Sequence, residues 1–300
     1  MYLFNERITN EQDWETVYQS IPAFALLIEH IMIKERLPVA KIENLTPGTN
    51  AVFKVGGYVI KIFAPEESGF DQVCDLETEL FATRWANQLN ISAPRVIANG
   101  FVEDKYHFSY MIMEYIEGVE FIEAVKTMTD AEKTDFGRKL RNITDRMNIP
   151  CEPFNDIDVI NDRGRYRRWD IYPEQFKKER LEYIKSHMYD EKVFVHGDLC
   201  GDNILLTPQG ELYILDFADA VLAPLIYEHT LLVFVFEFDP ALLKGYFGDL
   251  STDAYMDMLF NGLLIHDFGG DIVKDCFGKP DQFHTLDDLR KSLKEKVKIE

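Results

Sequence analysis

The spacing of hydrophobic positions changes from helical to extended near residue 40. Over residues 11–36 apolar side chains recur every three or four positions, which predicts a helical segment with a break near Pro22. Residues 51–55 and 58–63 are rich in β-branched and aromatic side chains and flank a pair of glycines. This pattern predicts a β-hairpin. The chain therefore begins with helix and continues into a sheet.

The remaining pattern predicts one helix and two strands, followed by a mostly helical region. The helix is predicted over 71–89 and the strands over 94–98 and 107–113. Further helices are predicted from Thr129 to Met147, over 175–188 and over most of 223–295, and a polar stretch at 153–172 predicts a surface connection. We therefore expect an α+β, bilobal fold. Its parts are a small N-terminal lobe of antiparallel sheet plus helix (1–113), a hinge (114–118) and a larger, mainly helical lobe (119–300).

Composition and charge narrow the classes of partner. The chain has 300 residues, of which 46% are hydrophobic, and a formal net charge of −20. Such acidity disfavours nucleic acid and anionic membrane and favours a cationic small molecule, although it can also serve solubility alone. No apolar run is long enough to cross a bilayer, no signal peptide is evident, and four scattered cysteines indicate reduced thiols. We expect a cytoplasmic protein, monomeric or weakly dimeric.

Two strand ends carry polar residues in an order that predicts chemistry. The first has the sequence His196-Gly-Asp198-Leu-x-x-x-Asn203, and the second ends in Asp216-Phe217-Ala. A carboxylate at Asp198 can accept the proton of a substrate hydroxyl, and the oxygens of Asn203 and Asp216 suit Mg²⁺. Each residue alone could equally be a turn or cap residue. Together they match the layout with which kinases hold a metal-bound triphosphate, and they predict a phosphotransferase.

A lysine in the predicted hairpin is a candidate for the nucleotide side of the site. Lys61 lies mid-strand between two isoleucines. Alternatively, a lysine at this position could protect the exposed edge of a sheet from pairing with another strand. If Lys61 binds the α- and β-phosphates, a glutamate on a neighbouring helix would hold it in place. Two glutamates, Glu77 and Glu79, lie on the helix that follows. Only one of them can face the sheet, and Glu79, at the edge of the apolar stripe, is favoured.

A turn and a strand end complete the predicted nucleotide site. Pro47, Gly48, Thr49 and Asn50 form a candidate loop over the phosphates, although a single glycine is a weak signal. Met113 and the backbone from Glu114 to Ile116 would meet the purine, and Met113 could equally fill a core. The chain has no P-loop motif, which excludes that architecture.

At these motifs the chain resembles the aminoglycoside phosphotransferase family, within the protein-kinase-like fold, and most of all its hygromycin-type branch. The resemblance covers residues 40 to 250. It implies Asp198 as the catalytic base, Asn203 and Asp216 as ligands of Mg²⁺, and a Lys61–Glu79 ion pair on the phosphates. It also implies that the hinge backbone at Glu114 and Ile116 binds ATP, with GTP as an alternative. His196 would brace the catalytic loop, and so would Glu228.

Departures from the protein-kinase pattern indicate a small-molecule acceptor. Ala218 occupies the third position of the Asp-Phe-Gly motif, and no Ala-Pro-Glu segment follows. Look-alike antibiotic kinases wall the acceptor pocket with carboxylates. The candidates here are Glu237, Asp239, Asp267 and Asp271.

The resulting expectation is a kinase that transfers the γ-phosphate of ATP to a hydroxyl of an aminoglycoside or aminocyclitol, a reaction that would confer antibiotic resistance. A metabolite kinase of choline, sugar or homoserine type fits the same residues. A regulatory module that binds nucleotide without transfer is a third possibility, disfavoured because all four key residues are present.

Overall fold

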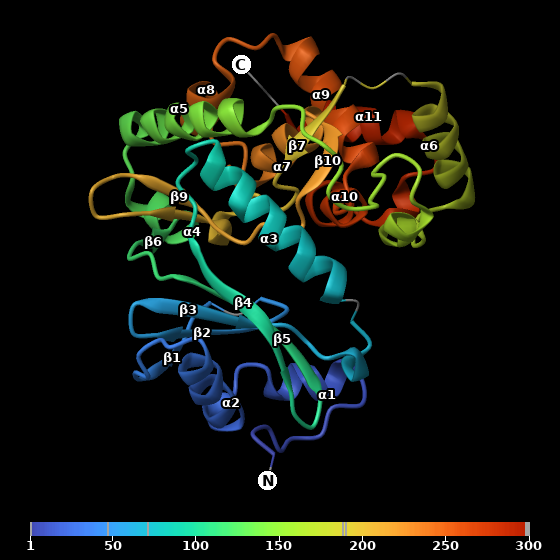
Figure 1. Ribbon diagram of the computed structural model, residues 1–300. Helices are drawn as coiled ribbons and strands as arrows, with labels where there is room; N and C mark the ends of the chain where they lie inside the picture. The colour runs from blue at the N-terminus through green and yellow to red at the C-terminus, as the bar shows by residue number, and fades with distance from the viewer. Residues whose placement is uncertain (1, 47, 71, 188, 190, 298–300) are drawn as a thin grey trace. The chain divides into compact units, whose positions relative to one another are not determined.

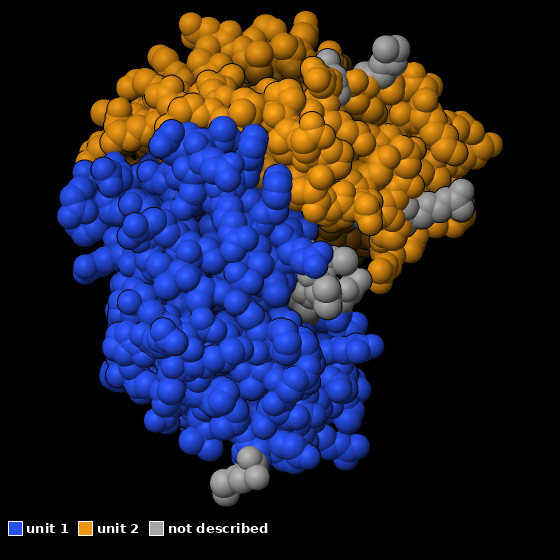
Figure 2. Space-filling view, viewed as in Figure 1, with its two compact units in different colours: residues 1–120, 204–219 blue, residues 121–203, 220–300 orange. Residues whose placement is uncertain are grey.

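The computed structural model describes residues 2–46, 48–70, 72–187, 189 and 191–297. The chain divides into two compact units, each made of two stretches of sequence (Figure 2). Unit 1 comprises 1–120 and 204–219, and unit 2 comprises 121–203 and 220–300. The segment 204–219 thus groups with the N-terminal sheet, and the lobe limits expected from the sequence (1–113 and 119–300) stay a prediction.

Three longer helices belong to unit 1: α1 (Glu11–Val17), α2 (Ile21–Lys34) and α3 (Gln72–Gln88). The predicted break near Pro22 is the start of α2, where the Ser20 side chain accepts a hydrogen bond from the Ala23 amide and Pro22 lies in the first turn. The apolar stripe of α2 is buried throughout. The helix predicted over 11–36 is confirmed, and so is the helix predicted over 71–89 apart from Asp71, which lies outside the described residues.

A five-stranded antiparallel sheet forms the centre of unit 1. Its strands are β1 (Ile42–Asn44), β2 (Ala51–Val55), β3 (Tyr58–Ile62), β4 (Val96–Glu103) and β5 (His107–Glu114), in the order β1-β2-β3-β5-β4. The predicted hairpin is β2–β3, and Gly56 at its turn has φ 62°, a left-handed conformation that glycine adopts without strain.

The two faces of this sheet have different roles. Ala51, Phe53, Ile60 and Ile62 point into an aromatic core that α1 and α2 cover. Lys61 points to the opposite face, because successive side chains of a strand alternate. Figure 1 shows α2 on one side of the sheet and α3 on the other. The sheet therefore presents a buried lysine toward α3.

Three short strands complete unit 1: β6 (Val119–Glu120), β8 (Ile204–Leu206) and β9 (Leu212–Ile214), in the order β6-β8-β9. The amide of Ile214 donates a hydrogen bond of 2.8 Å to the Ser92 carbonyl, between α3 and β4. This contact ties the end of β9, and with it the segment containing Asp216, to the rest of the unit.

Unit 2 is mainly helical. Its helices are α4 (Phe121–Ala124), α5 (Asp130–Met147), α6 (Glu174–Ser186), α7 (Ile226–Val235), α8 (Pro240–Phe247), α9 (Thr252–Ile265), α10 (Gly269–Phe277) and α11 (Leu286–Lys296). The Thr129–Glu132 capping box predicted for α5 is present. Two strands, β7 (Lys192–Val195) and β10 (Val221–Pro224), pair antiparallel.

The prediction of a surface connection at 153–172 is wrong for Trp169 and Tyr172. Trp169 ends a 3-10 helix (Arg163–Trp169) and is 1% exposed, and Tyr172 is 3% exposed. Both stack on Phe176 of α6 in the core of unit 2. Burying the large apolar surface of these two side chains is favourable enough to draw them into the core, although the residues around them in the sequence are polar.

Within the described residues, no individual helix combines the length and apolar character needed to cross a membrane. The pair α1 and α2 meets that test only jointly, and the two are bent by 84° to one another.

Candidate active site

A buried lysine joins two carboxylates in unit 1. The Nζ atom of Lys61 on β3 lies 2.8 Å from Oε2 of Glu79 on α3 and 2.8 Å from Oδ1 of Asp216. The side chains of Lys61 and Glu79 are 4% and 1% exposed, and that of Asp216 is 43% exposed. Glu77, the other glutamate considered from the sequence, is exposed to solvent. The helix thus turns Glu79 toward the sheet and Glu77 away from it.

The charges of this cluster stabilise one another. Burial alone would lower the pKa of Lys61, but the negative charges of Asp216 and Glu79 outweigh it and raise that pKa above its usual value. Burial raises the pKa of Glu79 to about 7 against the opposing effect of Lys61. With all three groups ionised, the cluster carries one negative charge in excess.

The backbone at Asp216 is strained. Its φ is 54°, a left-handed conformation that few residues other than glycine adopt, although aspartate tolerates it better than most. This conformation comes two residues after β9 and turns the carboxylate toward Lys61. Strained residues persist where the surrounding structure holds them, and they concentrate at functional sites.

In unit 2 the loop after β7 is held by its own side chains. The amide of Asp198 donates to Nδ1 of the buried His196 at 3.3 Å. The Asn203 side-chain amide donates to the backbone carbonyl of Asp198 at 2.8 Å and lies 3.4 Å from its Oδ2. The Asn203 nitrogen is therefore turned toward the loop, which leaves its oxygen on the other side.

A buried glutamate of α7 fixes the start of the same loop. Oε2 of Glu228 accepts hydrogen bonds from the amides of His196 at 2.7 Å and Gly197 at 3.3 Å. Burial raises the pKa of Glu228 to about 7, although the two amides lower it, and the charge of Asp198 adds to the increase. The expectation that His196 and Glu228 brace the loop is confirmed by these contacts.

The candidate phosphate loop is described at Gly48, Thr49 and Asn50, and Pro47 lies outside the described residues. The Asn50 side chain is buried and its Oδ1 accepts from the amide of Ala64 at 3.3 Å, so it supports the loop from inside. Thr49 and Gly48 are exposed, and apart from its chain neighbours no described residue has a heavy atom within 4 Å of where a Cβ on Gly48 would be. The loop is therefore open on its Gly48 side.

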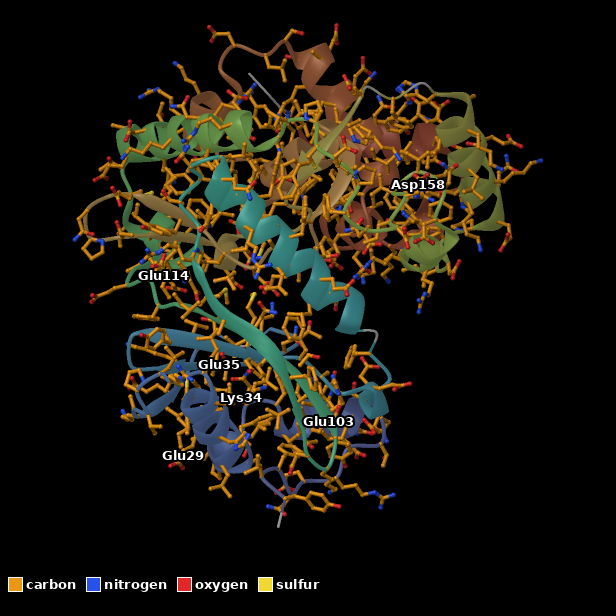
Figure 3. The ribbon with its side chains drawn as sticks, in the orientation of Figure 1. Glu29, Lys34, Glu35, Glu103, Glu114 and Asp158 are labelled. Atoms are coloured by element: carbon orange, nitrogen blue, oxygen red, sulfur yellow. The ribbon has the colours of Figure 1, made fainter. Side chains whose placement is uncertain are left out.

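The predicted hinge begins at the end of β5. Glu114, labelled in Figure 3, forms an ion pair of 2.9 Å with Arg95, and its amide donates to the Arg95 carbonyl. The amide of Tyr115 donates to the carbonyl of Gly57 at the β2–β3 turn. Met113 and Ile116 are half-buried. The side chain of Glu114 thus fixes the backbone proposed to meet the purine.

Three of the four carboxylates proposed to bind the acceptor form salt bridges with lysine or arginine side chains. Asp239 caps α8 and lies 2.6 Å from Lys133. Asp271 and Asp267 lie 2.5 Å and 3.7 Å from Arg168. The fourth candidate, Glu237, is exposed and has φ 49°.

Arg168 is a charged residue near these candidates that the sequence did not single out. Its guanidinium lies 4.7 Å from the ring centre of Phe268. In the sequence, Phe268 stands between Asp267 and Asp271. The only local signal was the arginine-rich stretch at 163–168, which contributed to the prediction of a surface connection.

A family model described as "Phosphotransferase enzyme family" matches residues 46–259, more than half of the chain. The chain belongs to this phosphotransferase family. The resemblance expected from the sequence is thereby confirmed at the level of the family, while the hygromycin-type branch stays a prediction. A comparison with curated proteins gives no match.

Solved structures of phosphotransferases share the fold. The chain is similar to APH(2'')-IIa in its ternary complex with streptomycin and ATP, with TM-score 0.57, 18% identity and coverage of 84% of this chain and 93% of that one. It is similar to the amicoumacin kinase hAmiN bound to AMP-PNP and Ca²⁺, with TM-score 0.60, 16% identity and coverage of 90% and 93%. It is also similar to the choline kinase LicA from Streptococcus pneumoniae, with TM-score 0.55, 17% identity and coverage of 90% and 98%. The expected α+β, protein-kinase-like fold is confirmed.

Each unit offers oxygen donors of a type that fits a divalent metal ion. Asp216 supplies a partly exposed carboxylate beside an excess negative charge, and Asn203 supplies an amide oxygen turned away from its loop. Hard oxygen donors of this kind suit Mg²⁺. Lys61 carries an ammonium, a group that can pair with phosphate oxygens.

Proposed function

We propose that the chain is a small-molecule kinase that transfers the γ-phosphate of ATP, or of GTP, to a hydroxyl group with the help of Mg²⁺. The observation that carries the proposal is the buried Lys61 between Glu79 and Asp216. A fold gains little from burying three charges, since apolar side chains of similar volume are often equally stable or more so. Buried charges arranged around a partly exposed carboxylate point to a ligand.

The nucleotide would bind through Lys61, which is held in place by Glu79, with its phosphates covered by the loop at 48–50. Asn203 and Asp216 would hold Mg²⁺, which neutralises charge on the phosphate oxygens when bound. The hinge at Met113, Glu114 and Ile116 would contact the purine.

Asp198 would act on the acceptor. Its carboxylate accepts the proton of the acceptor hydroxyl as the oxygen attacks the γ-phosphorus, and the bond from that phosphorus to the β-phosphate bridging oxygen breaks. His196, Glu228 and Asn203 restrain the loop on which Asp198 lies. Such restraint matters because catalysis in phosphoryl transfer is mainly positioning and charge stabilisation.

We propose a cationic, sugar-like acceptor such as an aminoglycoside or aminocyclitol, in keeping with a net charge of −20. Similar solved proteins are described in complexes with streptomycin, kanamycin and gentamicin. Asp267 and Asp271 stay candidates for the acceptor's ammonium groups, which would have to compete with Arg168 for them. Glu237 and Asp239 stay candidates as well, and at Asp239 the ammonium groups would compete with Lys133.

A metabolite kinase is the second candidate function. The similarity to a choline kinase favours it, because choline also joins a cationic group to a hydroxyl. The salt bridges of Asp239, Asp267 and Asp271 favour it too, since they leave fewer carboxylates for a polycation.

A thermal-shift panel separates these functions. Aminoglycosides and amino-alcohol metabolites are added singly to the protein with Mg²⁺ and AMP-PNP. A large rise in melting temperature with an aminocyclitol compound supports the antibiotic kinase, and a rise with choline or another amino alcohol supports the metabolite kinase. No shift with any compound, while AMP-PNP alone stabilises the protein, would favour a regulatory module.

A further inference from the structure

An N-terminal segment outside the family match contacts the candidate phosphate loop. Trp14 lies on α1, ahead of the matched residues 46–259. Its indole Nε1 donates a hydrogen bond of 2.9 Å to the backbone carbonyl of Thr49. The side chain is 1% exposed and meets Phe24 edge-to-face, with ring centres 5.9 Å apart. Packing therefore fixes the direction in which the N–H group points.

The other end of this segment is fastened to the turn between β4 and β5. The amides of Leu3 and Phe4 donate to the two carboxylate oxygens of Asp104 at 3.0 and 2.9 Å, and the amide of Ile8 donates to the Tyr106 hydroxyl at 2.8 Å. Burial would raise the pKa of Asp104, but the amides of Phe4 and Leu3 hold it below its usual value. The segment that leads to Trp14 is thus attached to the sheet by hydrogen bonds from its backbone amides.

Within the described residues of the loop, the other side-chain restraint comes from its inner side. Asn50 is held from inside by its contact with the Ala64 amide, and Gly48 faces open space. The hydrogen bond from Trp14 lies between these two positions. It determines how the Thr49 peptide is oriented, and so the direction of the amide that follows it.

We infer that Trp14 is a positioning residue for the loop at 48–50, through which the N-terminal segment controls nucleotide affinity. The nucleotide part of this inference rests on the proposed function, whereas the restraint on the loop does not. A loop held in its binding conformation loses less conformational freedom when a ligand binds, and it therefore binds more tightly than a free one.

The test replaces Trp14→Phe, which keeps an aromatic ring but removes the N–H donor together with the five-membered ring of the indole. Hydrogen exchange of backbone amides in peptides covering 48–53 should become about 3- to 10-fold faster, the range expected when one hydrogen bond is lost. The Kd of AMP-PNP with Mg²⁺, measured by titration calorimetry, should rise by a factor of similar size. Circular dichroism checks that the variant is folded.

Trp169→Phe is the matched control. Trp169 is also 1% exposed, but its Nε1 has no hydrogen-bond partner among the described residues, so the same substitution removes no hydrogen bond. A second variant, Asp104→Ala, releases the amides at the far end of the segment. It should also speed exchange at 48–53, to a smaller extent, and it keeps the inference testable should Trp14→Phe fail to fold.

The outcomes are distinct. Faster exchange at 48–53 and weaker AMP-PNP binding in Trp14→Phe, but not in Trp169→Phe, support the inference. Unchanged exchange at 48–53, or equal changes in both variants, would overturn it. If the wild type does not bind AMP-PNP, the proposed function fails, and the exchange at 48–53 alone decides whether Trp14 restrains the loop.

Discussion

The two groups of the candidate site are held by different forces. In unit 1 opposite charges hold Lys61, Glu79 and Asp216 together, with both contacts at 2.8 Å. In unit 2 the Asp198 loop is held through its backbone, because Glu228 accepts from two amides and Asn203 donates to a carbonyl. Under the proposed function, charge would prepare the group that binds the nucleotide, whereas backbone hydrogen bonds would prepare the group that acts on the acceptor.

This difference predicts different kinetic signatures. Removing a charge in unit 1 should weaken nucleotide binding, since in the proposed complex Lys61, held by Glu79, would contact the phosphates and Asp216 would hold Mg²⁺ in the ground state. Removing the Asp198 carboxylate should slow turnover and leave binding nearly intact, since a base acts in the transition state.

The largest effect is expected for Asp198→Ala. Turnover of the acceptor found in the thermal-shift panel should fall about 10²- to 10⁴-fold, the usual contribution of a general base. The Kd of AMP-PNP should change by less than about twofold, because the residue contacts no phosphate in the proposed complex. Steady-state kinetics and calorimetry measure both quantities.

Asp202→Ala is the control for that prediction. Asp202 is exposed and lies in the same loop, so its loss removes a charge of the same sign nearby. If both variants kept wild-type turnover, Asp198 would not be the base.

The next effect concerns Glu228 and pH. Its pKa is raised to about 7 in the folded protein from an ordinary value of 4.5. The stability that this shift contributes is present below pH 4.5 and is lost as the pH rises through about 7. The free energy of unfolding of the wild type should therefore fall by about 3 kcal/mol relative to Glu228→Gln between pH 5 and pH 8.

Urea denaturation of both proteins across this pH range measures the difference, which isolates Glu228 from other groups that titrate. Parallel pH profiles would show that Glu228 has an ordinary pKa in the folded protein.

The smallest effect separates the two neighbouring glutamates. Glu79→Gln keeps the size of the side chain but removes one of the two negative charges that pair with Lys61. It should weaken AMP-PNP binding about 10-fold. Glu77→Gln removes an exposed charge from the same helix and should change the Kd by less than about twofold. Equal effects of both substitutions would show that only net charge matters.

Much of this architecture is local and therefore predictable from the sequence. The β2–β3 hairpin follows from strand-forming residues on either side of Gly56, and α5 follows from its capping box. The loop from His196 to Asn203 is local only in part, because His196 and Asn203 restrain it from within eight residues, whereas Glu228 lies on α7. Glu79 could be favoured over Glu77 because a helix can turn only one of them toward the sheet.

Contacts between distant residues were beyond such reasoning. Nothing local indicates that Trp14 bonds to the carbonyl of Thr49, since every residue carries a carbonyl. The salt bridge of Arg168 with Asp271 joins residues 103 positions apart. The acidic residues read as acceptor ligands therefore looked more available in the sequence than in the structure.

The most direct test of the account is a calorimetric titration of AMP-PNP into the wild type and Asp216→Ala, with and without Mg²⁺. Asp216 belongs to the charged cluster and is also the proposed metal ligand, so one substitution removes both functions. We predict that Mg²⁺ strengthens binding to the wild type and has no effect on Asp216→Ala. Binding to the wild type that is absent, or equally strong without Mg²⁺, would contradict the account.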